Sequence, residues 1–141
     1  MKPIQRIFYS WQSDLPKLTN LNAIRQVLRD ASSMIESEIE DIRIEIDEAT
    51  RDLPGSPNIP KAIFGKISAS DIFVCDVTTI NTNTSADLRR VPNPNVLIEL
   101  GYAVATLGWD RIIMLFNTVH GNFPNDLPFD IDRHRATKFT I

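Results

Sequence analysis

The sequence predicts a flavodoxin-like α/β fold, with a five-stranded, mainly parallel sheet in the order 2-1-3-4-5 and helices on both faces. Two observations predict this class. Short runs of β-branched and aromatic residues alternate along the chain with segments whose apolar residues recur at helical spacing. Strands that alternate with helices imply parallel pairing through right-handed crossovers. The chain has 141 residues, so we expect one domain, 1–141, with a single core.

The first strand and the first helix are predicted from composition and periodicity. The segment Gln5–Trp11 (QRIFYSW) is short, aromatic and β-branched, which is typical of a strand. A helix follows from Asn20 to about Ser37, and either Thr19 or Asn20 is able to cap it. Its apolar residues recur at intervals of three and four and should face the sheet: Leu21, Ile24, Val27, Leu28, Ala31, Met34 and Ile35.

The middle of the chain predicts two strands around a second helix. Ile42–Ile46 (IRIEI) alternates apolar with charged residues, which indicates a half-covered strand at a sheet edge. Thr50–Pro60 contains three prolines and a glycine and should be a loop. Pro60 suits the first turn of a helix that runs to about Ala69. Asp71–Val77 (DIFVCDV) is nearly continuous in apolar residues, as a buried strand is.

The last part of the chain continues this alternation. Thr78–Asn95 is polar and rich in Asn and Thr, which predicts a loop long enough to be functional. A helix should cover Val96–Trp109, and Arg111–Asn117 (RIIMLFN) should be the fourth strand. After a loop rich in Gly, Pro and Asn, Ala136–Ile141 is the last strand-like segment. Because the chain stops near the end of that strand, we expect a domain taken from a longer protein, with a sensor domain or partner module elsewhere.

The composition excludes several classes of function. Hydrophobic residues make up 43% and charged residues 23%, as in ordinary globular proteins, and the net charge of −3 gives no basic surface for nucleic acid. One cysteine, Cys75, excludes an internal disulfide. His120 and His134 lack metal-ligand spacing, so no metal site is expected. No signal peptide or membrane-spanning run is apparent, which predicts a cytoplasmic protein without membrane contact.

Glu99 is the strongest candidate for a reactive group. It is the only charged residue in Val96–Trp109, which reads VLIELGYAVATLGW. A carboxylate among apolar neighbours is costly, and its pKa rises unless hydrogen bonds satisfy it. Packing of a helix does not require an acid at this position. The start of this helix should face the edge of the sheet where α/β proteins bind ligands, so we predict that Glu99 is catalytic.

Other polar residues should meet at the same edge, where the carboxyl ends of parallel strands lie. Each has a structural alternative: the acids can cap turns or form surface ion pairs, the tryptophan can fill the core, the asparagine can cap a helix, and the tyrosine can pack rather than bond to Glu99. No glycine-rich phosphate loop follows any strand, so arginines in the flanking loops are the available phosphate partners. The predicted substrate contacts are Ser10, Trp11, Gln12, Asp47, Arg51, Asp76, Asn95 and Tyr102.

These residues occur in segments that resemble the Toll/interleukin-1 receptor (TIR) domain in its bacterial, nucleotide-binding form. RIFYSW is similar to the first strand of that family, and ISASDIFVCDVT is similar to its third strand. The most specific part is PNPNVLIELGYAVATLGWDRIIMLF, which resembles the family's N-V-x-x-E-L-G helix with its catalytic glutamate, here Glu99. The same segment also resembles nucleoside 2-deoxyribosyltransferases, in which the glutamate of an E-x-G-Y-A motif is the nucleophile.

The resemblance implies cleavage of an N-glycosidic bond. In many bacterial TIR domains this is the nicotinamide–ribose bond of NAD+, often in anti-phage defence, with NAD+ as substrate rather than cofactor and with self-association on activation. We therefore expect an NAD+ glycohydrolase or cyclase that takes NAD+ or a related nucleotide. The alternatives are a nucleoside 2-deoxyribosyltransferase-like N-glycosidase and a non-catalytic nucleotide-binding or interaction module. The loop Thr78–Asn95 departs from the family pattern, which leaves substrate specificity open.

The leaving group separates the two enzymatic alternatives. Nicotinamide is cationic in NAD+ and leaves as a neutral molecule, so its departure requires no general acid, whereas most glycosidic leaving groups must be protonated. A carboxylate such as Glu99 can stabilise the positive ribose in the transition state, more strongly in a dry pocket than in water. Deoxyribosyl transfer requires a proton donor in addition, and Asp76 or Asp47 would have to supply it.

Overall fold

The computed structural model describes residues 2–49, 59–82, 88–132 and 134–141, and it confirms the predicted fold class. The sheet has five strands in the order β2-β1-β3-β4-β5. Every neighbouring pair is parallel, and β2 lies at an edge, as the alternating segment predicted. The strands are β1 (Ile4–Ser10), β2 (Arg43–Asp47), β3 (Ile72–Asp76), β4 (Ile112–Asn117) and β5 (Ala136–Phe139).

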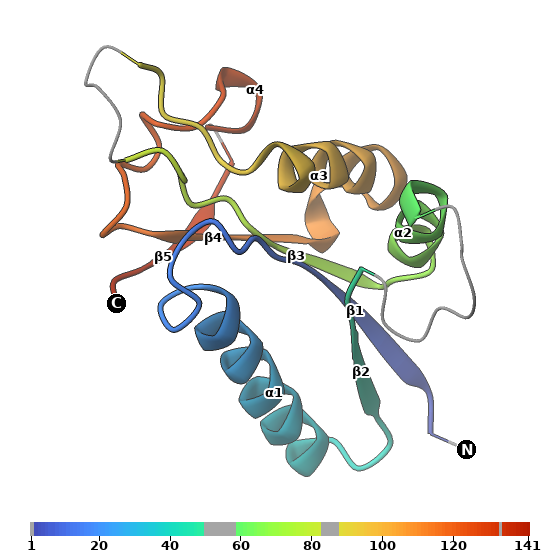
Figure 1. The fold of residues 1–141 in the computed structure, drawn as a ribbon. Helices are drawn as coiled ribbons and strands as arrows, with labels where there is room; N and C mark the ends of the chain where they lie inside the picture. Colours follow the sequence, from blue (N-terminus) through green and yellow to red (C-terminus); the bar gives the residue numbers. More distant parts are fainter. Residues whose placement is uncertain (1, 50–58, 83–87, 133) are drawn as a thin grey trace.

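Helices lie on both faces of the sheet (Figure 1). The helix α1 (Leu21–Glu38) covers one face, and α2 (Ile59–Ser68) and α3 (Pro94–Leu107) pack side by side on the other. Two short elements were not predicted. They are a 3-10 turn at Trp109–Arg111 and the helix α4 (Phe129–Asp132), which lies in the segment between β4 and β5.

The main core lies between the sheet and the pair α2 and α3. Phe8 on β1 and Phe73 on β3 are fully buried, and their rings stack with centroids 5.9 Å apart. Val96 and Leu100, on the inner side of α3, are also buried in this cluster. Burial of large apolar side chains here fixes α3 against the sheet and therefore sets where Glu99 lies.

The opposite face is covered less completely than the periodicity of α1 predicted. Leu21 and Ile24 are buried against the sheet, but Val27 and Met34 are each 63% exposed. The apolar residues of α1 occupy a wider arc than the strip that faces the sheet, which explains the error. No helix of the described residues is long and apolar enough to cross a membrane.

The start of α1 also differs from expectation. Asn20 occupies the N-cap position, but its side chain makes no capping hydrogen bond. The amide instead reaches the carboxylate of Asp76, 2.9 Å away at the end of β3. A short polar side chain at a helix start can bond either the helix backbone or a neighbouring element, and here the buried carboxylate is its partner.

Candidate active site

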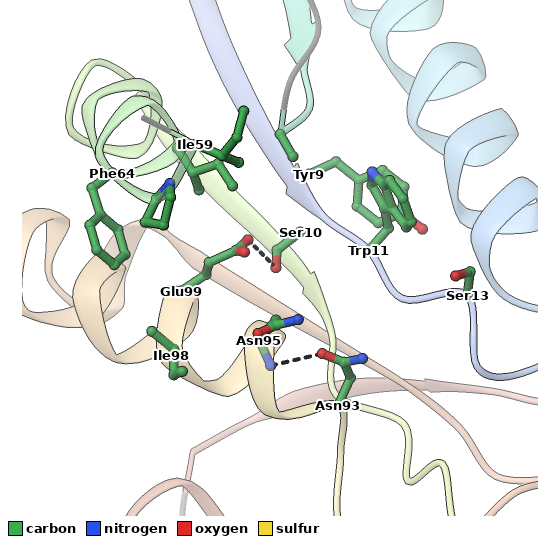
Figure 2. A pocket seen from close by; sticks show the side chains of 13 residues that line it. Tyr9, Ser10, Trp11, Ser13, Ile59, Phe64, Asn93, Asn95, Ile98 and Glu99 are labelled. Carbon is green, nitrogen blue, oxygen red and sulfur yellow. Dashed lines mark hydrogen bonds between the residues drawn. The ribbon is translucent and has the colours of Figure 1, made fainter. Parts of the chain in front are cut away.

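A pocket of about 460 Å³ opens at the edge of the sheet where the strands end (Figure 2). Its volume lies in the range of small-molecule sites, which is about 300–1,000 Å³. Three segments contribute most of its walls: the end of β1 with the residues that follow it, the first turns of α2, and the first turns of α3. The described residues that line it are Tyr9, Ser10, Trp11, Ser13, Ala49, Ile59, Pro60, Ile63, Phe64, Asn93, Asn95, Ile98 and Glu99.

Glu99 is the only charged residue among the described residues that line this pocket. Its side chain is half-buried and points toward the end of β1, where Ser10 Oγ donates a hydrogen bond to Glu99 Oε1 at 2.8 Å (Figure 2). Burial raises the pKa of Glu99 above its ordinary value, and the hydrogen bond from Ser10 opposes that rise. The carboxyl group of Glu99 is thus partly desolvated and has a second oxygen available to a ligand.

The sequence before Glu99 explains how α3 presents it. Asn93 caps the helix: its side-chain oxygen accepts hydrogen bonds from the backbone N–H groups of Asn95 at 2.8 Å and Val96 at 3.2 Å. Pro94 occupies the first turn, where its missing N–H and fixed φ suit a helix. Val96 and Leu100 face the core, and Glu99 lies three residues after Val96 on the adjoining side of the helix, at the margin of the core where the pocket opens.

Aromatic and apolar side chains line much of the pocket around Glu99. Trp11 is 36% exposed and stands at the exit from β1, where it can stack on a flat ring. The apolar side chains of α2 line the pocket on the side next to α3, and Ile63 and Phe64 are half-buried there. Sequence reasoning missed Ile63 and Phe64, whereas it placed Ser13 after the first strand, at the edge where the pocket lies. The crossover rule could have identified Ile63 and Phe64, because it places α2 beside α3 on the same face of the sheet.

Gln12 and Asp76, predicted substrate contacts, lie outside the pocket in a buried network. Asp76 is fully buried, and its carboxylate accepts hydrogen bonds from Gln12 Nε2 at 2.8 Å and Asn20 Nδ2 at 2.9 Å. Its other oxygen accepts from the backbone N–H and the hydroxyl of Thr78, at 3.1 and 2.6 Å. Asn117 joins the network through Asn20 Oδ1 at 3.1 Å. The loops that follow β1 and β3 cover these groups, and the sequence pattern did not indicate that coverage.

The other predicted contacts have protein partners or lie elsewhere. Asp47 forms an ion pair with Lys66 at 2.8 Å, and this pair is partly buried rather than on the surface. Tyr102 does not reach Glu99: its hydroxyl lies 2.6 Å from Ser68 Oγ, and its ring stacks on Phe64 with centroids 4.5 Å apart. Arg51 lies outside the described residues. Of the predicted site residues, the structure brings together Glu99, Ser10, Trp11 and Asn95.

The arrangement can stabilise a cation, and the described residues of the pocket include no acid besides Glu99. In the part of the chain that the structure describes, no group of three or more His, Cys, Asp or Glu side chains could hold a metal ion. The described lining supplies a carboxylate, hydroxyls, amides and an indole around a largely apolar hollow. This set fits a sugar that becomes positively charged beside Glu99 and a planar base beside an aromatic or apolar wall.

Comparisons with known proteins agree with this architecture. A family model described as "CAP12/Pycsar effector protein, TIR domain" matches residues 25–128. No curated protein matches the chain. A crystal structure of a conserved protein from Enterococcus faecalis V583 is similar in fold, with a TM-score of 0.54 and 11% sequence identity. The alignment covers 99% of this chain and 92% of that one.

Proposed function

The chain belongs to the TIR-domain family of CAP12/Pycsar effector proteins, and on this premise we propose that it cleaves the nicotinamide–ribose bond of NAD+. The observation that carries the proposal is Glu99, the one charged group among the described residues of a pocket with an aromatic and apolar wall. Products would be nicotinamide with ADP-ribose or a cyclic form of it.

The chemistry of NAD+ matches a site in which the described residues supply one carboxylate. Nicotinamide carries the positive charge before cleavage and leaves neutral, so the enzyme must stabilise a cationic ribose but need not donate a proton. Glu99 supplies the anion, and its partial burial strengthens the interaction with a developing cation. Trp11, across the pocket, offers a flat surface for a ring of the substrate.

Transfer of deoxyribose between bases is supported less well. A neutral purine or pyrimidine must be protonated as it leaves, which requires a second acid in the pocket. The two candidates, Asp47 and Asp76, are held by Lys66 and by the buried network. Neither lines the pocket in the part of the chain that the structure describes.

We also propose the biological setting that the family's description suggests. As a TIR effector, the domain would act in bacterial anti-phage defence, where loss of NAD+ stops the infected cell. Such an activity must be held in check, and self-association or a sensor domain would activate it.

The test is chromatography of NAD+ incubated with the protein at high concentration, with and without a crowding agent. The comparison includes Glu99→Gln and Glu99→Ala, with Glu38→Gln on the exposed end of α1 as a matched control. Nicotinamide release by the wild type and the control, but by neither Glu99 variant, supports the proposal. Transfer of deoxyribose from a deoxynucleoside to a free base supports the transferase instead, and nucleotide binding without either reaction supports a non-catalytic module.

A further inference from the structure

Two segments face each other across the candidate active site, and they are joined at two points. The first segment, Ser10–Asp14, leaves β1, and the second is the start of α3, from Asn93 to Glu99 (Figure 2). One link is the hydrogen bond from Ser10 to Glu99. The other lies just beyond the lining residues, where Asn93 Nδ2 donates a hydrogen bond to Asp14 Oδ2 at 2.7 Å.

We propose that Asp14 and Asn93 form a latch that positions Glu99 for the reaction proposed above, on which this inference rests. Both are positioning residues, because they act through the placement of α3 rather than on the substrate. Asn93 suits this role because both ends of its amide are used. Its oxygen caps α3 while its nitrogen binds Asp14, so one side chain fixes the helix start and ties it to the opposite segment.

Asp14 is exposed, but its backbone is anchored. Gln12 Oε1 accepts hydrogen bonds from the backbone N–H groups of Asp14 at 2.9 Å and Leu15 at 3.1 Å. Gln12 is itself buried, and its amide nitrogen bonds to the fully buried Asp76. A continuous chain of hydrogen bonds therefore runs from the interior of the sheet through Asp14 to the first turn of α3. Because Asp14 is held in place, its bond to Asn93 costs little additional ordering.

The consequence for catalysis follows from distance along the helix. Glu99 lies between one and two turns after Asn93, on a helix that starts at Pro94. A shift of the helix start displaces the carboxylate relative to Ser10 and Trp11. Misplacement of a reacting group by about 1 Å can cost up to about a hundredfold in rate. The latch should thus affect kcat more than KM.

The pair allows a reversal experiment. Asn93→Asp keeps an oxygen for the helix cap but sets two carboxylates against each other, so the latch opens while the cap remains. Asp14→Ala removes the acceptor. In the double variant Asp14→Asn with Asn93→Asp, the amide introduced at position 14 can donate to the carboxylate introduced at position 93, which restores the bond with its polarity reversed. Asp14→Asn alone retains a neutral acceptor and should have the mildest effect.

Two readouts are measured on each variant of the full chain. The first is kcat and KM for nicotinamide release from NAD+. The second is acrylamide quenching of Trp11 fluorescence in a Trp109→Phe background, which leaves Trp11 as the one tryptophan of the chain. The melting temperature is followed throughout, since the latch predicts little change in it for Asn93→Asp.

We expect kcat/KM to fall about tenfold in Asp14→Ala and Asn93→Asp, with increased quenching of Trp11, and both properties to recover in the double variant. A double variant as impaired as Asn93→Asp would overturn the latch, as would unchanged quenching and kinetics in Asn93→Asp. If the wild type releases no nicotinamide, the proposed function fails, and the quenching series still decides whether the latch exists.

Discussion

Glu99 and Asp76 are two acids near the edge of the sheet where the strands end, and their environments are opposite. Asp76 is fully buried, and its two oxygens accept four hydrogen bonds from Gln12, Asn20 and Thr78. Glu99 is half-buried in a pocket wall and has one hydrogen bond from a side chain, donated by Ser10. Hydrogen bonds saturate the carboxylate of Asp76 inside the protein, whereas Glu99 keeps an oxygen for a ligand at the pocket wall, as the proposed reaction requires.

The same change, from carboxylate to amide, should therefore have opposite effects at the two positions. Glu99→Gln should reduce nicotinamide release about a thousandfold, because the amide cannot balance a cationic ribose. Its stability should not fall. Burial raises the pKa of Glu99, so the folded state holds the proton more tightly than the unfolded chain.

The pH dependence of folding stability gives a second readout for Glu99→Gln. The stability of the wild type should fall as pH rises from the ordinary glutamate pKa through the raised pKa of the folded state. The variant lacks this loss, so its melting temperature should equal or exceed that of the wild type near neutral pH. The difference should vanish in acid. A variant that is less stable near neutral pH would instead indicate a structural role for Glu99.

Asp76→Asn should have the next largest effect, which is a loss of folding stability. An amide nitrogen in place of one oxygen faces donors of Gln12, Asn20 or Thr78, which leaves buried polar groups unpaired. We expect a loss of about 3 kcal/mol in the free energy of unfolding, measured by urea denaturation. Full stability in this variant would remove the contrast between the two acids.

Ser10→Ala should have a smaller effect on the rate of nicotinamide release, and the size of this effect should depend on pH. Without the hydrogen bond from Ser10, burial acts unopposed and the pKa of Glu99 rises further. The rate of nicotinamide release should fall by about three- to tenfold near neutral pH, and the rising limb of the pH–rate profile should move to higher pH. Ser13→Ala, at a pocket serine in the same segment, is the control that should leave the limb in place.

Tyr102→Phe should have the smallest effect. The ring still stacks on Phe64, and only the bond to Ser68 at the exposed edge of α2 is lost. We expect at most about 1 kcal/mol of lost stability, with nearly unchanged kcat/KM. A large fall in kcat/KM with normal stability would make Tyr102 a substrate contact after all.

The sequence was sufficient for the fold and for the position of Glu99. Alternation of strands and helices predicted the order of the sheet, and an isolated charge on an apolar helix marked the side chain that faces the pocket. The sequence did not show that Glu99 faces the pocket whereas Asp76 does not. That distinction depends on Gln12 and Asn20, which come from other elements and reach Asp76 only once the chain is folded.

Side chains with two plausible partners were also beyond sequence reasoning. Asn20 could cap α1 or enter the network, and Tyr102 could face Glu99 or α2; local spacing permits both outcomes. Packing of α1 and α2 against the sheet decides between them. The apolar pocket residues of α2 could not be predicted either, because in the sequence they resemble ordinary core positions.

The pH dependence of kcat/KM for nicotinamide release from NAD+ tests the central claim most directly. If an ionised Glu99 suffices and no group must donate a proton, the profile between about pH 5 and pH 8 rises along one limb to a plateau. The midpoint of that limb should lie above the ordinary pKa of a glutamate. A bell-shaped profile, with a falling limb that reports a required acid, would contradict the account.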